Sequence, residues 1–303
     1  MTKFFQLLAS GAALGAIYAL VCLGFVVIYR ATGVINFAQA GIVVLGAFLT
    51  YNSSETWGVS FFPGLLIAAI LGGLLGIVIE RVVLRRMVGQ PVYALLLVTV
   101  GVLLMVSPIV TTIWRNPPPT LDTPLHLDKV SIFDVQITWL NITTVLIAAV
   151  VVTGFFLFFQ YTKYGVAMRA TAVDQEAALM QGINVNLVVA LSWAIAGIVA
   201  VLGGAMLAAG AGPGVGLGVG IGIIALKALP AMVLGGLDSP GGAVVGGLAI
   251  GIAEVMTKGY QGGIGISWLE NPAFARTLPW IIMLVVLLAR PYGLFGTRAV
   301  QRL

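Results

Sequence analysis

The sequence predicts an all-α, polytopic membrane bundle of about eight or nine transmembrane helices, with a short cytoplasmic helix and a Gly-rich broken segment. Composition is the first basis: 60% of the 303 residues are hydrophobic and only 8% are charged. A soluble domain carries about 25% charged residues, so most of this chain's surface must face lipid. The second basis is a series of apolar stretches that approach the roughly 20 residues needed to cross a bilayer.

Nine apolar stretches follow one another along the chain. They lie at residues 7–29, 34–51, 62–79, 91–113, 139–159, 187–210, 218–236, 241–257 and 278–289. The seventh and ninth are the weakest candidates, and either could be re-entrant or short and tilted, so eight spans is the alternative. The first stretch has no cleavage site of the A-x-A type, and we expect a retained helix there.

Basic residues predict which side of the membrane each loop faces, because Lys and Arg are enriched in cytoplasmic loops. With nine alternating spans, one side collects Arg30, Arg81, Arg85, Arg86, Lys163, Arg169, Arg290, Arg298 and Arg302. The opposite loops, at 52–60, 114–138 and 258–277, are richer in Pro, Asn, Gly and acidic residues. We therefore expect the loops at 80–90 and 160–186 to lie in the cytoplasm.

The residue content also excludes several classes of function. Cys22 is the single cysteine and His126 the single histidine, so neither a metal site nor a cofactor is expected. The net charge of +5 belongs to loops beside a membrane and does not indicate nucleic-acid binding. No G-x-x-x-x-G-K-[ST] loop is present, so any ATP must be hydrolysed by another chain. Asp238, His126 and Glu254 are expected at different depths, which disfavours an intramembrane enzyme.

Glycine is abundant, at 39 residues, and it is patterned. Pairs four residues apart occur at Gly11/Gly15, Gly72/Gly76, Gly242/Gly246 and Gly247/Gly251. Small residues on one helix face let backbones approach closely in a membrane, so these pairs predict helix packing. Between 210 and 222 every even position is glycine, a poor helix former. We expect a broken or extended entry into the seventh span there, serving either packing or pore lining.

Several residues inside the predicted spans are considered for a substrate path through the membrane. Lys227 and Glu254 lie well inside spans, where charged groups face the bundle interior or water. Their expected depths differ by roughly 8 Å at 1.5 Å per residue, so an ion pair between them is left open. Asn36 and Gln39 share one helix face, and their amides either join helices or line the path. The candidate path residues are Asn36, Phe37, Gln39 and Lys227.

The loop YGVAMRATAVDQEAALMQGINV, residues 164–185, predicts a short amphipathic helix outside the membrane. Val173, Ala177 and Met180 fall on one face at i, i+4 and i+7, and Gly182 suits a left-handed helix end. Such a compact rod can seat in a groove of a separate ATPase and transmit its movement. An interfacial helix on lipid is the alternative, but the acidic, nearly aromatic-free surface disfavours it. The expected coupling contacts are Arg169, Ala170, Asp174, Glu176, Ala177, Ala178 and Gly182.

Motifs spread over nearly the whole length resemble the LivH-type permease family of branched-chain amino-acid ABC importers. They are ALGAIYALVCLGFVVIYRATGVINFAQAG, IERVVLRR, RATAVDQEAALMQGINV and LKALPAMVLGGLDSPGGAVVGGLAIGIAE. The resemblance implies one permease domain over 1–303 in a bacterial inner membrane, with residues 164–185 as its coupling loop. It also implies partners: a second homologous permease chain, two cytoplasmic ATPase subunits that bind the ATP, and a periplasmic solute-binding protein.

The same resemblance leaves the solute open. Members of the family carry leucine, isoleucine and valine, and relatives carry urea, short amides, other amino acids and aromatic acids. Where many members read NFAHG, this chain reads NFAQA, which places Gln39 and Ala40 at an expected path position. The alternative function is a stand-alone secondary carrier or channel for a small neutral solute.

Overall fold

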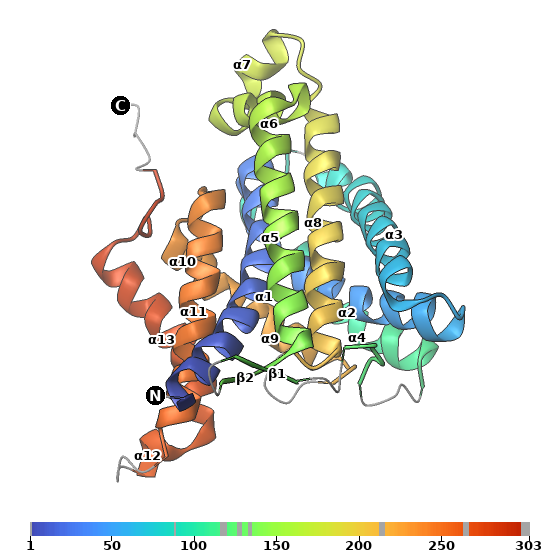
Figure 1. The fold of residues 1–303 in the computed structure, drawn as a ribbon. Helices are drawn as coiled ribbons and strands as arrows, with labels where there is room; N and C mark the ends of the chain where they lie inside the picture. The colour runs from blue at the N-terminus through green and yellow to red at the C-terminus, as the bar shows by residue number, and fades with distance from the viewer. Residues whose placement is uncertain are drawn as a thin grey trace.

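The computed structural model describes residues 2–87, 89–115, 120–125, 129–132, 135–211, 216–262 and 267–297. These residues form a bundle of helices that run between two ends of the molecule (Figure 1). His126, Arg298, Arg302 and residues 212–215 of the Gly-rich stretch lie outside the described residues.

Seven helices in the described residues are long and apolar enough to cross a membrane. They are α1 (Thr2–Thr32), α3 (Phe61–Val82) continued by the 3-10 helix η2 (Leu84–Met87), α4 (Val92–Ile113), α5 (Trp139–Tyr161), α8 (Val185–Ala208), α11 (Pro240–Tyr260) and α13 (Pro272–Ala289). Seven of the nine predicted ranges therefore contain a helix of spanning length, and the multi-pass helical architecture is confirmed.

The second and seventh predicted ranges contain shorter helices. In the second, α2 (Ala38–Tyr51) continues into the π-helix η1 (Asn52–Thr56). In the seventh, α9 (Ile221–Leu226) and α10 (Ala228–Gly235) are interrupted at Lys227, a break that lies after the Gly-rich stretch where one was predicted. Most side chains of α2 are buried, so protein rather than lipid surrounds it.

The remaining elements lie at the two ends of the bundle. α6 (Lys163–Val173) and α7 (Gln175–Met180) project from one end. The N-terminus, α12 (Ser267–Glu270) and a hairpin of β1 (Lys129–Ile132) and β2 (Val135–Thr138) lie at the opposite end (Figure 1). The hairpin strands are antiparallel, with Lys129 opposite Thr138.

The first helix forms the centre of the bundle. In α1, 94% of the most apolar window is buried, against 17% in α4 and α5 and 11% in α13. α1 packs against α11, α8, α5 and α10, so it contacts helices from both halves of the chain. The poorly buried apolar helices are on the outside of the bundle, where their apolar side chains face lipid.

Glycine allows the close approach of α1 and α11. A Cβ on Gly251 would lie 2.3 Å from the backbone of Gly15, and one on Gly247 would lie 2.4 Å from Ala19 N. The same holds where α3 meets α8: a Cβ on Gly76 would lie 2.2 Å from Trp193 O. The predicted packing role of the spaced glycines is confirmed.

The chain after α13 folds back onto the end of α10. The N–H of Leu294 donates to Leu234 O at 2.9 Å, and the N–H of Phe295 donates to Gly235 O at 3.1 Å. These bonds satisfy carbonyls that the helix end leaves unpaired. Asp238, in the turn before α11, accepts hydrogen bonds from the backbone and hydroxyl of Thr297.

Candidate functional site

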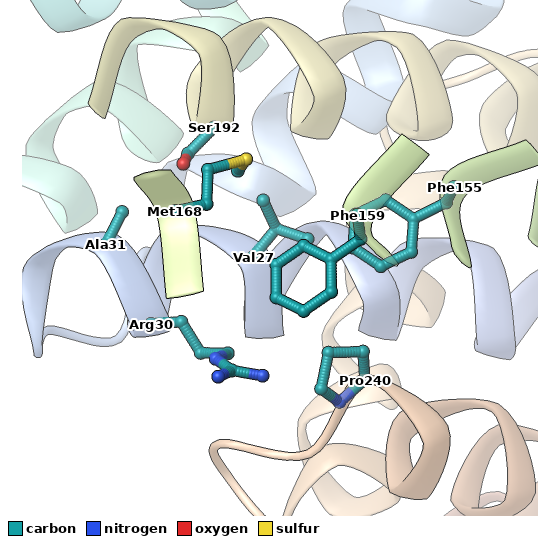
Figure 2. A pocket seen from close by; sticks show the side chains of 8 residues that line it. All are labelled: Val27, Arg30, Ala31, Phe155, Phe159, Met168, Ser192 and Pro240. Atoms are coloured by element: carbon teal, nitrogen blue, oxygen red, sulfur yellow. The ribbon is translucent and has the colours of Figure 1, made fainter. Parts of the chain in front are cut away.

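Two regions contain the candidate functional residues, and the first is the α6–α7 projection. Arg169 on α6 is bound to the end of α5, where it donates to the carbonyls of Phe159 and Gln160. Its guanidinium and that of Arg30 lie 5.5 and 5.1 Å from the centre of the Phe159 ring, a cation–π geometry. Figure 2 shows Arg30 and Phe159 among the side chains that line a small pocket, together with Met168 of α6. The projection is therefore anchored to α1 and α5.

Asp174 divides the predicted helix in two. Its backbone is extended, at φ −157° and ψ 112°, and its side chain accepts a hydrogen bond from Ala177 N at 3.0 Å. Val173 consequently ends α6 instead of lying on one continuous helix with Ala177 and Met180, which corrects that part of the prediction. The physical reason is that Asp is a strong N-cap residue and starts a new helix where its oxygen meets a free backbone N–H.

The projection keeps an apolar surface that no described residue covers. Val173 is 86% exposed and Met180 is 88% exposed. Glu176 and Ala177 are also exposed, whereas Arg169, Ala170 and Asp174 are half-buried. Ala178 is only 4% exposed and faces the bundle. Of the predicted coupling contacts, Glu176, Ala177 and Gly182 are therefore the exposed ones.

The end of α7 has the predicted left-handed turn. Gly182 has φ +79°, a backbone conformation that residues other than glycine rarely adopt. Its N–H donates to Leu179 O, and the N–H of Ile183 donates to Ala178 O at 3.0 Å. These two hydrogen bonds close the C-terminal end of α7, and the chain then turns into α8.

One side chain connects α7 to the central helix. Gln175 Nε2 donates to Ala31 O, in the last turn of α1, at 2.9 Å. Gln175 also lines two grooves, one of about 840 Å³ that reaches Asp238 and Thr297, and one of about 290 Å³ that reaches Glu80 and Arg85. Gln175 was not among the predicted coupling contacts, because its partner is 144 residues away in the chain.

The amides before and in α2 are buried, and one of them joins two helices. Gln39 is fully buried, and its Nε2 donates to Ala196 O on α8 at 3.1 Å. Asn36 is 1% exposed and accepts from Ala38 N at 3.1 Å. Phe37 is half-buried, and its N–H donates to Thr99 Oγ1 on α4 at 3.2 Å. Of the two roles left open for these amides, the structure shows the helix-joining one for Gln39.

The second region is a buried charge cluster. Lys227 Nζ forms an ion pair with Glu254 Oε1, and the Tyr18 hydroxyl donates to Glu254 Oε2 at 2.8 Å. Lys227 is 7% exposed, Glu254 3% and Tyr18 1%. The ion pair that the sequence left open therefore forms. The break between α9 and α10 and the long lysine side chain overcome the expected depth difference.

This cluster lies at a cavity of about 310 Å³. The cavity is lined by Tyr18, Gly220, Ile223, Ile224, Lys227, Glu254, Lys258, Pro272, Ala275, Arg276 and Trp280. Asn36, Phe37 and Gln39 do not line it, so the structure separates Lys227 from the other three candidate path residues. Tyr18 was not predicted as a site residue, although a phenol in the middle of a long apolar stretch was an available signal.

Comparisons with known proteins place the chain among permeases. A model of the family described as branched-chain amino acid transport system, permease component, matches residues 7–287. The chain is 26% identical to the high-affinity branched-chain amino acid transport system permease protein LivH of Salmonella typhimurium, over 99% of this chain and 97% of that protein. It is 29% identical to the corresponding BraD protein of Pseudomonas aeruginosa, over 99% and 98%.

Among solved structures, the chain is similar to PsaBC from Streptococcus pneumoniae in complex with Fab, with a TM-score of 0.47 and 16% identity over 94% of this chain and 90% of that chain. The family match covers the bundle from α1 to α13 and includes both regions described above. The chain therefore belongs to the family of permease components of branched-chain amino acid transport systems.

Proposed function

We propose that this chain is the permease subunit of a binding-protein-dependent ABC importer. It moves a branched-chain amino acid or a related small solute inward across the bacterial inner membrane. Its proposed partners are a second homologous permease chain, two cytoplasmic ATPase subunits and a periplasmic solute-binding protein. The chain has no phosphate-binding loop of its own, so the ATPase subunits supply the hydrolysis.

The observation that carries the proposal is the exposed apolar surface of the α6–α7 projection. Val173 and Met180 are almost fully exposed at one end of the bundle. Exposed large apolar side chains that lie together mark interaction sites with proteins or membranes. The projection is also held rigidly, by Arg169 to α5 and by Gln175 to α1. A rigid, apolar-tipped projection fits a docking element for an ATPase.

The same contacts provide a route for force into the bundle. A displacement of α7 pulls on the end of α1 through the Gln175–Ala31 hydrogen bond. α1 is packed against α11 through the glycine contacts, and its Tyr18 binds Glu254. Movement of α7 therefore reaches the Lys227–Glu254 pair through one continuous helix, and a two-state change of α1 would alter that pair.

The test is ATP-driven uptake by the chain reconstituted with its partners. Met180→Glu places a charge on the proposed docking surface without disturbing the fold, since Met180 is 88% exposed. We expect hydrolysis stimulated by the loaded binding protein to fall about tenfold or more, in keeping with the loss of an apolar interface anchor. The matched control is Met180→Leu, which keeps a large apolar side chain at the same exposed position. Unchanged coupled uptake in Met180→Glu would refute the docking role.

The competing function is a carrier that acts alone. Liposomes that contain only the purified chain distinguish the two. Solute uptake without ATPase or binding protein would establish the carrier, whereas the importer proposal expects none above the leak of empty liposomes.

A further inference from the structure

We propose that the cavity at the Lys227–Glu254 pair is an entry site that binds the carboxylate of the transported solute. The inference rests on the proposed importer function and deepens it, because it selects a carboxylate-bearing solute with an apolar group over urea and neutral amides. The carboxylate contacts would come from Lys258 and Arg276, with Lys227 beneath them.

The charges around the cavity favour an anionic group. Three cations, Lys227, Lys258 and Arg276, line it together with one carboxylate, that of Glu254. Lys227 and Glu254 neutralise each other. Lys258 and Arg276 are exposed, and neither forms an ion pair with any residue that the structure describes. Two exposed cations on one cavity, with no ion-pair partner among the described residues, attract a carboxylate, and a guanidinium binds it with two parallel hydrogen bonds.

The wall of the cavity is apolar. Ile223, Ile224, Ala275 and Trp280 line it beside the basic residues and the buried pair. The volume of about 310 Å³ lies at the small end of the range for ligand pockets, roughly 300–1,000 Å³. A solute with a carboxylate at one end and a short apolar group at the other therefore matches the site in charge, polarity and size.

The buried pair lines the cavity, so the contacts of Lys227 and Glu254 can change when a solute binds. Tyr18 and Lys227 both bind the Glu254 carboxylate, through different oxygens. A solute carboxylate near Lys227 competes with Glu254 for the ammonium group. Lys227 lies at the break between α9 and α10, and Tyr18 lies on α1, the helix that Gln175 connects to α7. Occupancy of the cavity is thereby linked to the helix that receives force at the other end.

The position of the cavity fits entry rather than exit. Lys258 and Pro272 flank the connection that contains α12, at the end of the bundle opposite α6 and α7 (Figure 1). If α7 faces the cytoplasmic ATPase, the cavity opens in the outer half of the membrane, where the binding protein delivers the solute.

Cysteine protection tests the site directly in the assembled transporter. Ile223→Cys places a thiol on the cavity wall at a side chain that is 70% exposed, and the native Cys22 is fully buried. The transporter is held in zwitterionic lipid nanodiscs and labelled with a maleimide. We expect L-leucine to slow the labelling, and leucinamide and urea, which lack the carboxylate, to leave its rate unchanged. Equal protection by leucinamide, or no protection by leucine, would overturn the proposal.

Variants of the mouth identify the residues responsible. Arg276→Gln and Lys258→Gln should each weaken protection by leucine about tenfold, the effect of losing one charge-assisted hydrogen bond. Lys3→Gln is the matched control: Lys3 lies 5.1 Å from the Tyr260 ring centre and does not line the cavity. Leucine should protect the introduced thiol equally well with and without Lys3→Gln. If phosphatidylglycerol slows labelling and leucine does not, the cavity binds lipid and the proposal is wrong.

Uptake assays on the same variants separate this inference from the importer proposal. In Arg276→Gln, the solute concentration for half-maximal ATP-driven uptake should rise while the ATPase still responds to the binding protein. If uptake stays unchanged, the entry site is refuted and the importer remains. If no preparation shows ATP-driven uptake, including the parent, the importer proposal itself fails.

Discussion

At the scale of single residues, Lys227 and Glu254 form the ion pair of the described residues in which both side chains are buried. A charge in the membrane interior is costly, and each of these two is stabilised by the other. The Tyr18 hydroxyl binds the second carboxylate oxygen at 2.8 Å, so both oxygens of Glu254 have partners. Removal of either charged partner leaves the other buried without compensation.

Lys227→Met should therefore lower the free energy of unfolding by about 3–5 kcal/mol, the cost of breaking a buried pair on one side. Unfolding in mixed detergent micelles, followed by circular dichroism, measures the loss. The double variant Lys227→Met/Glu254→Gln should recover most of it, because no charge then remains buried. Lys258→Met, at an exposed position, is the control and should change little. A double variant as unstable as the single one would contradict this account.

At the scale of the element, two contacts determine how the helices are arranged. One is the glycine interface of α1 and α11, where the backbones of Gly15 and Gly251 leave no room for a side chain. The other is the left-handed turn at Gly182, which closes α7 before α8 begins. The first fixes the centre of the bundle, and the second fixes the direction of the projection.

Gly251→Val should destabilise the bundle by about 1–3 kcal/mol or more, because the added atoms overlap the backbone of Gly15. The same detergent unfolding experiment measures the change. Gly154→Ala on α5 is the matched control, since no atom lies within 4 Å of a Cβ there and alanine is the better helix former by about 1 kcal/mol. Equal losses in the two variants would show that close packing is not the cause.

Gly182→Ala should loosen α7 without unfolding the bundle. A left-handed conformation costs a side-chain-bearing residue about 1–2 kcal/mol, and Gly182 has φ +79°. Hydrogen exchange over residues 174–183 should accelerate while exchange in α1 stays the same. Gly182→Asn should show a smaller effect, because Asn tolerates this conformation better. The buried Ala178 supports the same packing, so a charged residue there would also act through the fold of α7. Unchanged exchange in Gly182→Ala would contradict the role of the turn.

At the scale of the whole molecule, the two ends of the bundle have different proposed roles. The α7 end carries the exposed apolar projection together with Arg30, Arg85 and Arg169. The opposite end carries α12, the hairpin and the mouth of the cavity. α1 connects them, since it reaches Gln175 at one end and Glu254 midway.

This arrangement predicts opposite labelling of two single-cysteine variants in sealed inner-membrane vesicles. Met180→Cys should react with an impermeant maleimide only from the cytoplasmic face, and Trp268→Cys only from the periplasmic face. Met180 and Trp268 are exposed and Cys22 is buried, so labelling in each variant comes from the introduced thiol. Reaction of Met180→Cys from the periplasmic face would contradict the orientation and, with it, the docking role of α7.

Local patterns along the chain predicted much of this structure. Hydropathy located seven of the spanning helices, and the four-residue spacing of glycines identified the close contacts. Gly182 was recognised as a left-handed helix end. Asp174 was misread as part of a continuous helix, although an N-cap residue followed by helix formers was a readable signal.

By itself, the sequence determined that the chain is a multi-pass helical membrane protein and where its helices approach closely, because composition and spacing act over a few residues. Only the tertiary structure decided that Lys227 pairs with Glu254, that Tyr18 joins them across 236 positions, and that Ala178 faces inward. These contacts depend on the tilt and breaks of helices packed against one another, and hydropathy, which describes each stretch alone, does not encode that geometry.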